Sequence, residues 1–304
     1  MRSDYGNDFV VFADYDATIT RRYLSKPPGD SLCYTAFRTV ECYTEFPKAY
    51  AELAKSLHTH YFAIETDGSL SIEEKLPYMI EWYQKVMDSM VKFGAEINFD
   101  VNQMVREALD LPSDASNSGD NTSLGPHAKG KAGPNPKIEI RPGMIELINL
   151  CHSRGIPFVI ISAGFANIIE EVLTLHGVGR EKYELWSNVM DIAEDATSGK
   201  QLLKGLKNEL LHMYNKTLKT GVTPKKILDI CKTKKAAVTI GDSLGDSKIA
   251  VSEEVHFDEI IKVGLLNYKI EENLEKYRAA FDLLYIGDKD AYDIVNVIER
   301  ISSK

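Results

Sequence analysis

The sequence predicts an α/β protein whose core is a doubly wound parallel sheet, with a helical cap inserted after the first strand. Three short apolar runs carry this prediction, at residues 9–13, 158–161 and 236–240. Each is rich in β-branched or aromatic residues, is too short for a helix and ends abruptly at a polar residue, as buried strands of parallel sheets do. Helical patterns separate the runs, and this alternation predicts the doubly wound order.

The remaining core elements follow from periodicity and from residues that begin or end helices. Residues 141–154 form a helical pattern, with Pro142 near its first turn and Gly155 after its end. Residues 168–176 form another, closed by Gly177. The later elements are strands at residues 260–266 and 281–286, with a helix at residues 271–281 between them.

The long segment between the first two strands requires a fold of its own. We predict a mostly helical cap over residues 21–137 and a core formed by residues 1–20 and 138–304. Within the cap, residues 112–137 are rich in Ser, Asn, Gly and Pro, and cannot bury enough surface to offset the entropy of ordering. We therefore predict a mobile surface loop there.

Two cap helices are predicted from apolar spacing. They cover residues 46–57 and 72–90. Ser71 and Glu74 resemble a capping box that opens the second helix.

Composition excludes several classes of protein. The chain has 304 residues, with 36 Lys and Arg against 45 Asp and Glu, a net charge of −9. It lacks the basic footprint of a nucleic-acid or anionic-membrane binder. A small anionic substrate remains compatible, because one pocket can be positive in a negative protein. We expect a monomer that acts on a small molecule.

Cysteine usage bears on the compartment. The four cysteines form no C-x-x-C pair and no zinc-ligand spacing, so we predict free thiols in a reducing compartment. Residues 1–8 lack the pattern of a signal peptide, and no segment has the roughly 18 apolar residues that span a bilayer. We expect a cytoplasmic protein.

Polar residues follow the three apolar runs: Asp14, Ser162 and Asp242. Ligands of a doubly wound sheet bind beyond the carboxyl ends of its strands, so we expect these side chains to meet in one pocket. One such residue alone is more often a helix N-cap. The convergence of several favours a functional site.

The first cluster reads D-x-D-x-T and contains Asp14, Asp16 and Thr18. Two aspartates at this spacing past a strand can share a site, one as nucleophile and the other as general acid or base. Attack of a carboxylate on phosphorus forms an aspartyl phosphate, which divides a difficult hydrolysis into two easier steps. A divalent cation would offset the repulsion between the two acids.

The cluster after the third run reads G-D-x-x-G-D. Asp242 would complete an oxygen-ligand shell for Mg2+. Asp246 is better placed to orient the loop or a metal-bound water. The alternatives are a solvated acidic turn and a weak calcium loop.

Two further features could hold a phosphate. Ser162 and Ala163 offer a hydroxyl and backbone N–H groups near a helix start, although small residues at such turns often serve packing. Lys216 is a candidate cation for the phosphoryl oxygens, although a lone lysine usually lies on the surface.

Together these motifs resemble the four motifs of the haloacid dehalogenase superfamily of phosphohydrolases. A closer resemblance covers most of the chain: the sequence looks like the cytosolic pyrimidine 5′-nucleotidases, also called cytosolic 5′-nucleotidase III. The matching segments are residues 61–65, 73–83, 187–191, 204–205, 209–216 and 241–246.

The resemblance implies roles for individual residues. Asp14 corresponds to the nucleophile and a Mg2+ ligand. Asp16 corresponds to the proton donor, which also binds the metal through its backbone carbonyl, and Asp242 to the third ligand. Phosphate contacts map to Ser162, Ala163 and Lys216.

Glu65 maps to the cap carboxylate that reads the base. A carboxylate accepts a hydrogen bond from an exocyclic amino group such as that of cytosine. Without the resemblance, Glu65 fits a solvated acid near a helix start. Candidates for a base-stacking platform are Tyr61, Phe62, Tyr78 and Trp82, although the same spacing fits the core of a cap. Ala17 stands where relatives often carry Met, which leaves the motif chemistry intact.

The implied activity is Mg2+-dependent hydrolysis of pyrimidine nucleoside 5′-monophosphates such as CMP and UMP. One alternative is a phosphatase of another small monoester, such as 7-methylguanosine monophosphate or a phosphoamino acid. Glu65 favours a base-reading cap over one that reads an amino acid. A second alternative is a non-catalytic binding protein on the same fold.

Overall fold

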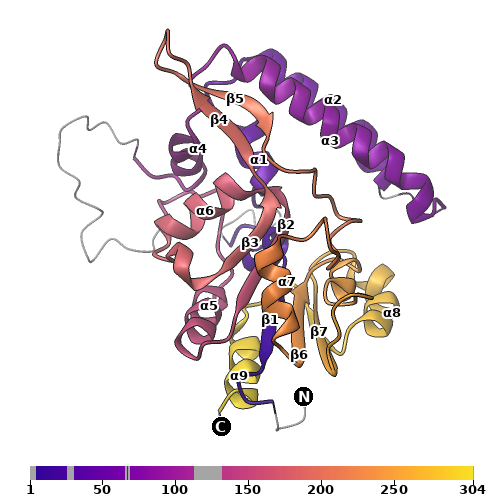
Figure 1. The fold of residues 1–304 in the computed structure, drawn as a ribbon. Helices are drawn as coiled ribbons and strands as arrows, with labels where there is room; N and C mark the ends of the chain where they lie inside the picture. The colour runs from indigo at the N-terminus through magenta and orange to yellow at the C-terminus, as the bar shows by residue number, and fades with distance from the viewer. Residues whose placement is uncertain (1–4, 26–30, 66, 68, 113–131, 304) are drawn as a thin grey trace.

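The predicted doubly wound core is confirmed in the computed structural model, which describes residues 5–25, 31–65, 67, 69–112 and 132–303. Within these residues, six parallel strands form one sheet in the order β3-β2-β1-β6-β7-β8 (Figure 1). The strands are β1 (Phe9–Ala13), β2 (Phe158–Phe165), β3 (Glu184–Asn188), β6 (Ala236–Gly241), β7 (Glu259–Leu266) and β8 (Leu283–Ile286). The strand order reverses between β1 and β6, which is where ligands of such sheets bind.

The central strand β1 is buried on both faces. Phe9, Val11 and Ala13 belong to one hydrophobic cluster, whereas Val10 and Phe12 belong to another. This alternation follows from the two-residue period of a strand. The first face is covered by α5 (Met144–Ser153), α6 (Ala166–Leu175) and α9 (Tyr292–Ile301), and the second by α7 (Lys225–Lys232). The core also contains the helix α8 (Ile270–Ala280) and two short 3-10 helices, η2 (Arg180–Lys182) and η3 (Asp246–Lys248).

Among the described residues between β1 and β2, four α-helices follow the turn η1 (Tyr15–Ile19). They are α1 (Ala36–Glu41), α2 (Lys48–Glu65), α3 (Ile72–Gly94) and α4 (Val101–Ala108). The two predicted helices of this segment are confirmed as α2 and α3, which pack side by side (Figure 1). The predicted capping box is confirmed too. The Ser71 backbone N–H donates to Glu74 at 2.8 Å, and the Glu74 N–H donates to the Ser71 hydroxyl at 3.2 Å.

A β-hairpin in the second half of the chain was not predicted. Strands β4 (Met190–Glu194) and β5 (Gln201–Leu206) pair antiparallel, and β5 packs against α3. The Phe99 N–H donates to the Gln201 carbonyl at 2.8 Å, which ties the hairpin to the segment between α3 and α4. The sequence places these residues with the core, whereas their contacts reach the helices of the segment between β1 and β2.

Several predicted boundaries differ from those of the structure, and α2 continues to Glu65, well beyond the predicted end at residue 57. Strand β2 continues past Ser162 to Phe165, with a shift of register after Ile161, so Ser162 lies within the strand and not after it. Helix α5 begins at Met144, because Gly143 precedes it with a left-handed φ of 93°.

Most of the predicted mobile loop at residues 112–137 lies outside the described residues, which resume at residue 132. The end of this segment is fastened to α4, because the Lys137 N–H donates to the Ala108 carbonyl at 2.6 Å.

All four cysteines are free thiols, as predicted.

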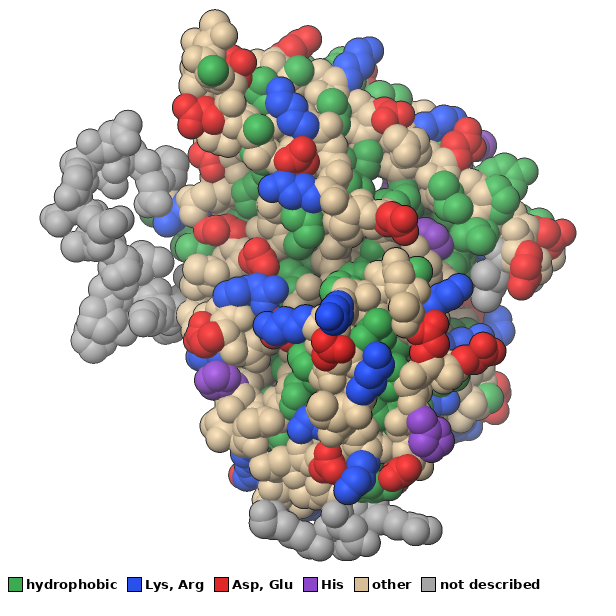
Figure 2. Space-filling model, viewed as in Figure 1, with side chains coloured by type: hydrophobic (Ala, Val, Ile, Leu, Met, Phe, Trp, Pro, Cys, Tyr) green, Lys and Arg blue, Asp and Glu red, His purple; other side chains and the backbone are tan. Residues whose placement is uncertain are grey.

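Among the described helices, none is both long and apolar enough to cross a membrane. Figure 2 shows acidic and basic side chains interspersed over one face of the molecule.

Candidate active site

The strands that carry three of the predicted site residues lie next to one another in the sheet. Asp14 follows β1, Ser162 lies near the end of β2, and Asp242 follows β6. Asp14 is 5% exposed, and its N–H donates to the Ile240 carbonyl at 3.0 Å, which fixes it beside β6.

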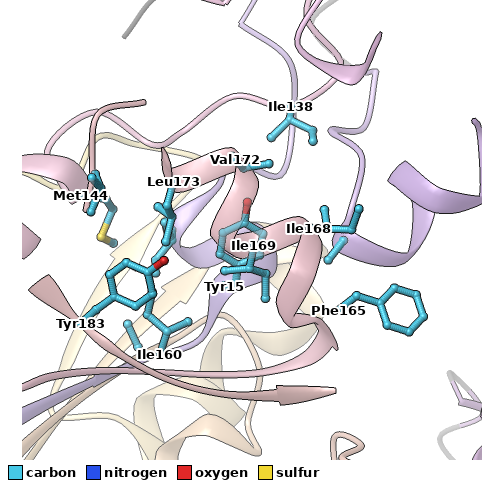
Figure 3. Close-up of a cluster of buried hydrophobic side chains, with 14 of the residues drawn as sticks. Tyr15, Ile138, Met144, Ile160, Phe165, Ile168, Ile169, Val172, Leu173 and Tyr183 are labelled. Atoms are coloured by element: carbon cyan, nitrogen blue, oxygen red, sulfur yellow. The ribbon is translucent and has the colours of Figure 1, made fainter. Parts of the chain in front are cut away.

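A tight turn over η1 (Tyr15–Ile19) carries the chain away from β1. Tyr15 anchors the turn, since its ring is buried among α6 side chains such as Ile169 (Figure 3). Asp16 follows it with extended dihedral angles, and its Oδ1 accepts a hydrogen bond from the Ala36 N–H at 3.0 Å. Thr18 is fully buried within the turn. Asp14 and Asp16 therefore leave the same strand end, and Asp16 is fastened to the start of α1.

A cluster of acids lies at the switch point of the sheet. Carboxylate oxygens of Asp14, Asp242 and Asp246 lie within 4.8 Å of one another. Asp246 Oδ2 accepts from the Ser243 N–H at 2.9 Å and from its hydroxyl at 2.8 Å. A Cβ at Gly241 would lie 2.1 Å from the Asp246 Cβ, so glycine is required for this close approach.

Lys216 reaches this acid cluster from a loop far away in sequence. Its Nζ lies 2.5 Å from Asp14 Oδ1 and 3.7 Å from Asp246 Oδ1, and the side chain is 10% exposed. The surface position that a lone lysine usually takes is therefore not the one observed. Burial disfavours the ammonium form, but the charges of Asp14 and Asp246 outweigh it, and the pKa of Lys216 is raised.

Asn188 is a structural residue of the site to which the sequence assigned no role beyond the family resemblance. Its fully buried Nδ2 donates to the Ala163 carbonyl at 2.7 Å and to the Leu211 carbonyl at 2.8 Å, and its Oδ1 accepts from the Leu211 N–H at 2.8 Å. One amide thus joins the irregular end of β2 at residues 162–164, named here the Ser162 turn, to the loop that carries Lys216.

The Ser162 turn packs directly on Asp16. The Ser162 hydroxyl is buried and accepts from the Gly164 N–H at 3.1 Å, while Ala163 is part-exposed. A Cβ at Gly164 would lie 2.6 Å from the Ala36 Cβ and 3.4 Å from Asp16 Oδ2. Glycine therefore lets the turn, the start of α1 and Asp16 share one small volume.

Burial and the repulsion between neighbouring carboxylates raise the pKa values of three aspartates at the site. Burial raises the pKa of Asp14 to about 6, against the opposing charge of Lys216. Burial and the charge of Asp14 raise the pKa of Asp16 to about 7. Burial, followed by the charges of Asp14 and Asp246, raises the pKa of Asp242 well above its ordinary value. Clustered oxygen donors of this kind fit Mg2+, whose charge would offset their repulsion.

Glu65 is the last residue of α2. Its backbone carbonyl accepts from Lys75 Nζ at 2.8 Å. Burial raises the pKa of its carboxyl, against the opposing charge of Lys75. Glu65 also helps to raise the pKa of the Tyr214 hydroxyl, although burial contributes more, so its charge reaches the loop that carries Lys216.

Tyr83 on α3 is a residue that the sequence did not single out. Burial raises the pKa of its hydroxyl; Lys216 opposes this shift, whereas Glu65, Asp16 and Asp14 add to it. The charges of Glu65 and of the catalytic candidates therefore both act on this hydroxyl. Tyr83 also lines a cavity of about 500 Å³ between α3 and β5.

The predicted aromatic platform divides into buried and exposed members. Tyr61 is 1% exposed and stacks on Trp82, with ring centroids 5.8 Å apart and an interplanar angle of 11°, so it belongs to the packing between α2 and α3. Phe62 and Tyr78 are 39% and 45% exposed. Helical spacing predicts which apolar residues share one face of a helix. It does not predict which of them are buried between the helices and which are exposed.

Solved structures similar to this chain share its fold. A cytosolic 5′-nucleotidase IIIB bound to cytidine matches with a TM-score of 0.77 at 22% identity, covering 98% of this chain and 87% of that one. A haloacid dehalogenase family hydrolase from Salmonella enterica matches with a TM-score of 0.50 at 10% identity, covering 97% and 73% of the two chains.

Sequence comparison identifies the family. The human 7-methylguanosine phosphate-specific 5′-nucleotidase is 28% identical over 297 residues, covering 97% of this chain and 85% of its own. The Drosophila melanogaster protein of the same name is 24% identical over 291 residues, covering 93% of this chain and 79% of its own. The family model for pyrimidine 5′-nucleotidase (UMPH-1) matches residues 17–116 and 130–302. The chain therefore belongs to the pyrimidine 5′-nucleotidase family and is a 5′-nucleotidase with a haloacid dehalogenase-like fold.

Proposed function

We propose that this 5′-nucleotidase hydrolyses pyrimidine nucleoside 5′-monophosphates, CMP and UMP, through an aspartyl phosphate on Asp14. The proposal rests mainly on the buried ion pair between Lys216 Nζ and Asp14 Oδ1, which lie 2.5 Å apart. Asp16, two residues from Asp14, has a pKa raised to about 7. This pairing holds a nucleophile and a phosphate-binding cation together, with a proton donor two residues away.

In the first step, a carboxylate oxygen of Asp14 attacks phosphorus. A bond forms between Asp14 and phosphorus while the bond from phosphorus to the 5′ oxygen breaks. Asp16 gives its proton to that leaving oxygen, which frees the nucleoside. In the second step, Asp16 takes a proton from water as the water attacks the aspartyl phosphate, which releases phosphate and restores both acids. Lys216 and the Ser162 turn hold the phosphoryl oxygens throughout.

The residues present fit a Mg2+ ion. Asp14, Asp242 and the Asp16 carbonyl would hold it, with Asp246 beside them supporting the loop. When bound, the ion supplies positive charge to the phosphoryl oxygens and to the acid cluster.

We assign recognition of the nucleotide base to Glu65. We infer that α1–α4 and the β4–β5 hairpin form the cap, since β5 packs on α3, and that Glu65 and Tyr83 face the nucleoside. An ionised Glu65 accepts a hydrogen bond from the amino group of cytosine or from the N3–H of uracil.

A second candidate substrate is 7-methylguanosine monophosphate. Relatives at 24% and 28% identity are named as specific for it. The same Glu65 carboxylate can accept from the N1–H and the amino group of the guanine ring. The similar structure bound to cytidine supports the pyrimidine reading.

We also infer that the enzyme is monomeric and acts in the cytoplasm. Its free thiols and its likeness to a nucleotidase named as cytosolic support the location.

A phosphate-release panel tests the proposal, using CMP, UMP, AMP, 7-methyl-GMP and phosphoserine, with Mg2+ and with EDTA. We expect the highest kcat/KM on CMP and UMP, and no turnover in EDTA. Glu65→Gln should lower kcat/KM on CMP by about tenfold to a hundredfold, the cost of weakening one charged hydrogen bond, with little effect on phosphoserine. Glu73→Gln, an exposed acid in the first turn of α3, is the matched control.

The substrate, the role of Glu65 and the identity of the nucleophile can each be contradicted by a different result. Faster release from 7-methyl-GMP than from CMP favours the second candidate. Equal rates on phosphoserine and CMP contradict base reading by Glu65. Full activity of Asp14→Asn contradicts the assignment of the nucleophile.

A further inference from the structure

The peptide after Asp16 has an unusual conformation. Ala17 lies in the left-handed region, with φ 57° and ψ 8°. A residue with a Cβ rarely adopts this region, and it persists only where the surroundings enforce it. Because Ala17 directly follows Asp16, its dihedral angles help to set the direction in which the turn presents Asp16.

Two buried side chains converge on the Ala17 carbonyl. Arg141 Nη2 donates to it at 2.7 Å, and Asn267 Nδ2 donates to it at 2.8 Å. Arg141 is 1% exposed and Asn267 is 6% exposed. Arg141 also donates through Nε to the Thr18 carbonyl at 2.8 Å, so the turn is bound at consecutive carbonyls.

The arginine is itself held firmly. Its Nη2 lies 3.0 Å from Asp288 Oδ1, and its Nη1 donates to the Lys289 carbonyl at 2.5 Å. Asp288 accepts in addition from the Tyr23 N–H at 3.0 Å. Asn267 follows β7 directly, so the two donors are anchored independently of each other, one to the sheet and one to the chain after β8.

We propose that Asn267 and Arg141 are positioning residues for the general acid. By binding the Ala17 carbonyl they hold the left-handed peptide, and this peptide aims the Asp16 carboxyl at the leaving oxygen while Ala36 binds its other side. The inference rests on the proposed role of Asp16. Within the part of the chain that the structure describes, the hydrogen bonds found for these two side chains go to the turn after Asp16 and to residue 289, so their loss should affect the chemical step and spare substrate binding.

The test is a double-mutant cycle between Asn267→Ala and Ala17→Gly, with kcat and KM measured on CMP. Glycine adopts φ near 57° without a steric cost, so the turn needs less support in the A17G background. We expect N267A to lower kcat about tenfold in the natural background and less than about threefold in the A17G background, with KM within about twofold throughout. Ser302→Ala, which removes a buried hydroxyl from the end of α9, is the matched control and should leave kcat unchanged.

Arg141→Lys provides a second arm if N267A does not fold. Lysine keeps a positive charge for Asp288 but cannot reproduce the planar fork that binds several carbonyls. The same drop in kcat, relieved by A17G, is expected.

Equal losses of kcat in both backgrounds, or a loss confined to KM, would overturn the proposal. Thermal unfolding of each variant identifies any loss that reflects unfolded protein. Asp16→Asn separates the two levels of inference. If D16N abolishes turnover while N267A retains full kcat, only the positioning role is wrong. If D16N retains turnover, the proposed role of Asp16 is wrong.

Discussion

In the proposed mechanism, Asp16 gives up a proton in one half of the reaction and takes one back in the other. A carboxyl with an ordinary pKa would be ionised at neutral pH and could not donate. Burial beside Asp14 raises the pKa of Asp16 to about 7, where both forms are populated. The hydrogen bond from Ala36 holds the group in place in either form.

This tuning should destabilise the metal-free protein. The pKa of Asp16 is raised from 3.8 to about 7, so the associated stability is present below about pH 4 and is lost as pH rises through 7. Asn has no charge to lose and can still accept from the Ala36 N–H. We expect Asp16→Asn in EDTA to be more stable than the natural protein at pH 8, by on the order of 2 kcal/mol.

Thermal unfolding in EDTA at pH 5 and pH 8 measures this difference. The advantage of D16N should shrink at pH 5. A difference that is the same at both pH values would show that the charge of Asp16 is not its cause.

At the scale of elements, the site depends on how closely α1 approaches the end of β2. Gly164 permits this approach, because a Cβ there would lie 2.6 Å from the Ala36 Cβ. Gly164→Ala should push α1 away and weaken the hydrogen bond to Asp16. We expect kcat on CMP to fall at least about tenfold, since small displacements of catalytic groups are costly.

Gly94→Ala is the control for this change. Its Cβ would also meet a neighbour closely, at 3.2 Å from the Phe99 ring, but it lies at the end of α3. It should leave kcat unchanged. Normal kcat in a fully folded G164A would contradict the account of α1.

Elements with a strong hydrophobic period could be predicted from the sequence, and those that depend on contacts could not. The buried runs at β1 and β6 and the helical stripes of α2 and α3 carry their own signal. The β4–β5 hairpin does not, because it is a partly polar hairpin that packs on α3 and is tied through Phe99. Its position depends on an element about a hundred residues earlier.

The candidate site divides in the same way. Asp14, Asp16 and Asp242 follow strands, so their meeting could be argued from topology. Sequence spacing alone does not decide between a phosphate-binding role and a surface position for Lys216, because only tertiary structure brings it to Asp14. Asn267, Arg141 and Tyr83 gave no local signal, since their roles arise from hydrogen bonds and charges across the fold.

At the scale of the whole molecule, the net charge of −9 is partly concentrated at the active site. Four aspartates gather there around one lysine. The fold holds them together at a cost that bound Mg2+ would offset.

We therefore expect Mg2+ to raise the melting temperature. At a hundred times its Kd, a ligand that binds only the folded state contributes about 2.7 kcal/mol. Differential scanning fluorimetry across a Mg2+ titration at pH 7.5 measures the shift, with Asp242→Asn as the variant that should lose most of it. An equal shift in D242N would place the ion elsewhere.

The hydrogen bonds of Asn188 have a consequence for how the fold can vary. They fasten Leu211 to the end of β3, so the chain from 189 to 210 leaves and returns at one fixed point. The β4–β5 hairpin lies within this closed excursion. It can change in length or tilt while Lys216 keeps its place beside Asp14. If the hairpin belongs to the proposed cap, this part of the cap can diverge in sequence and length without displacing the lysine that pairs with Asp14.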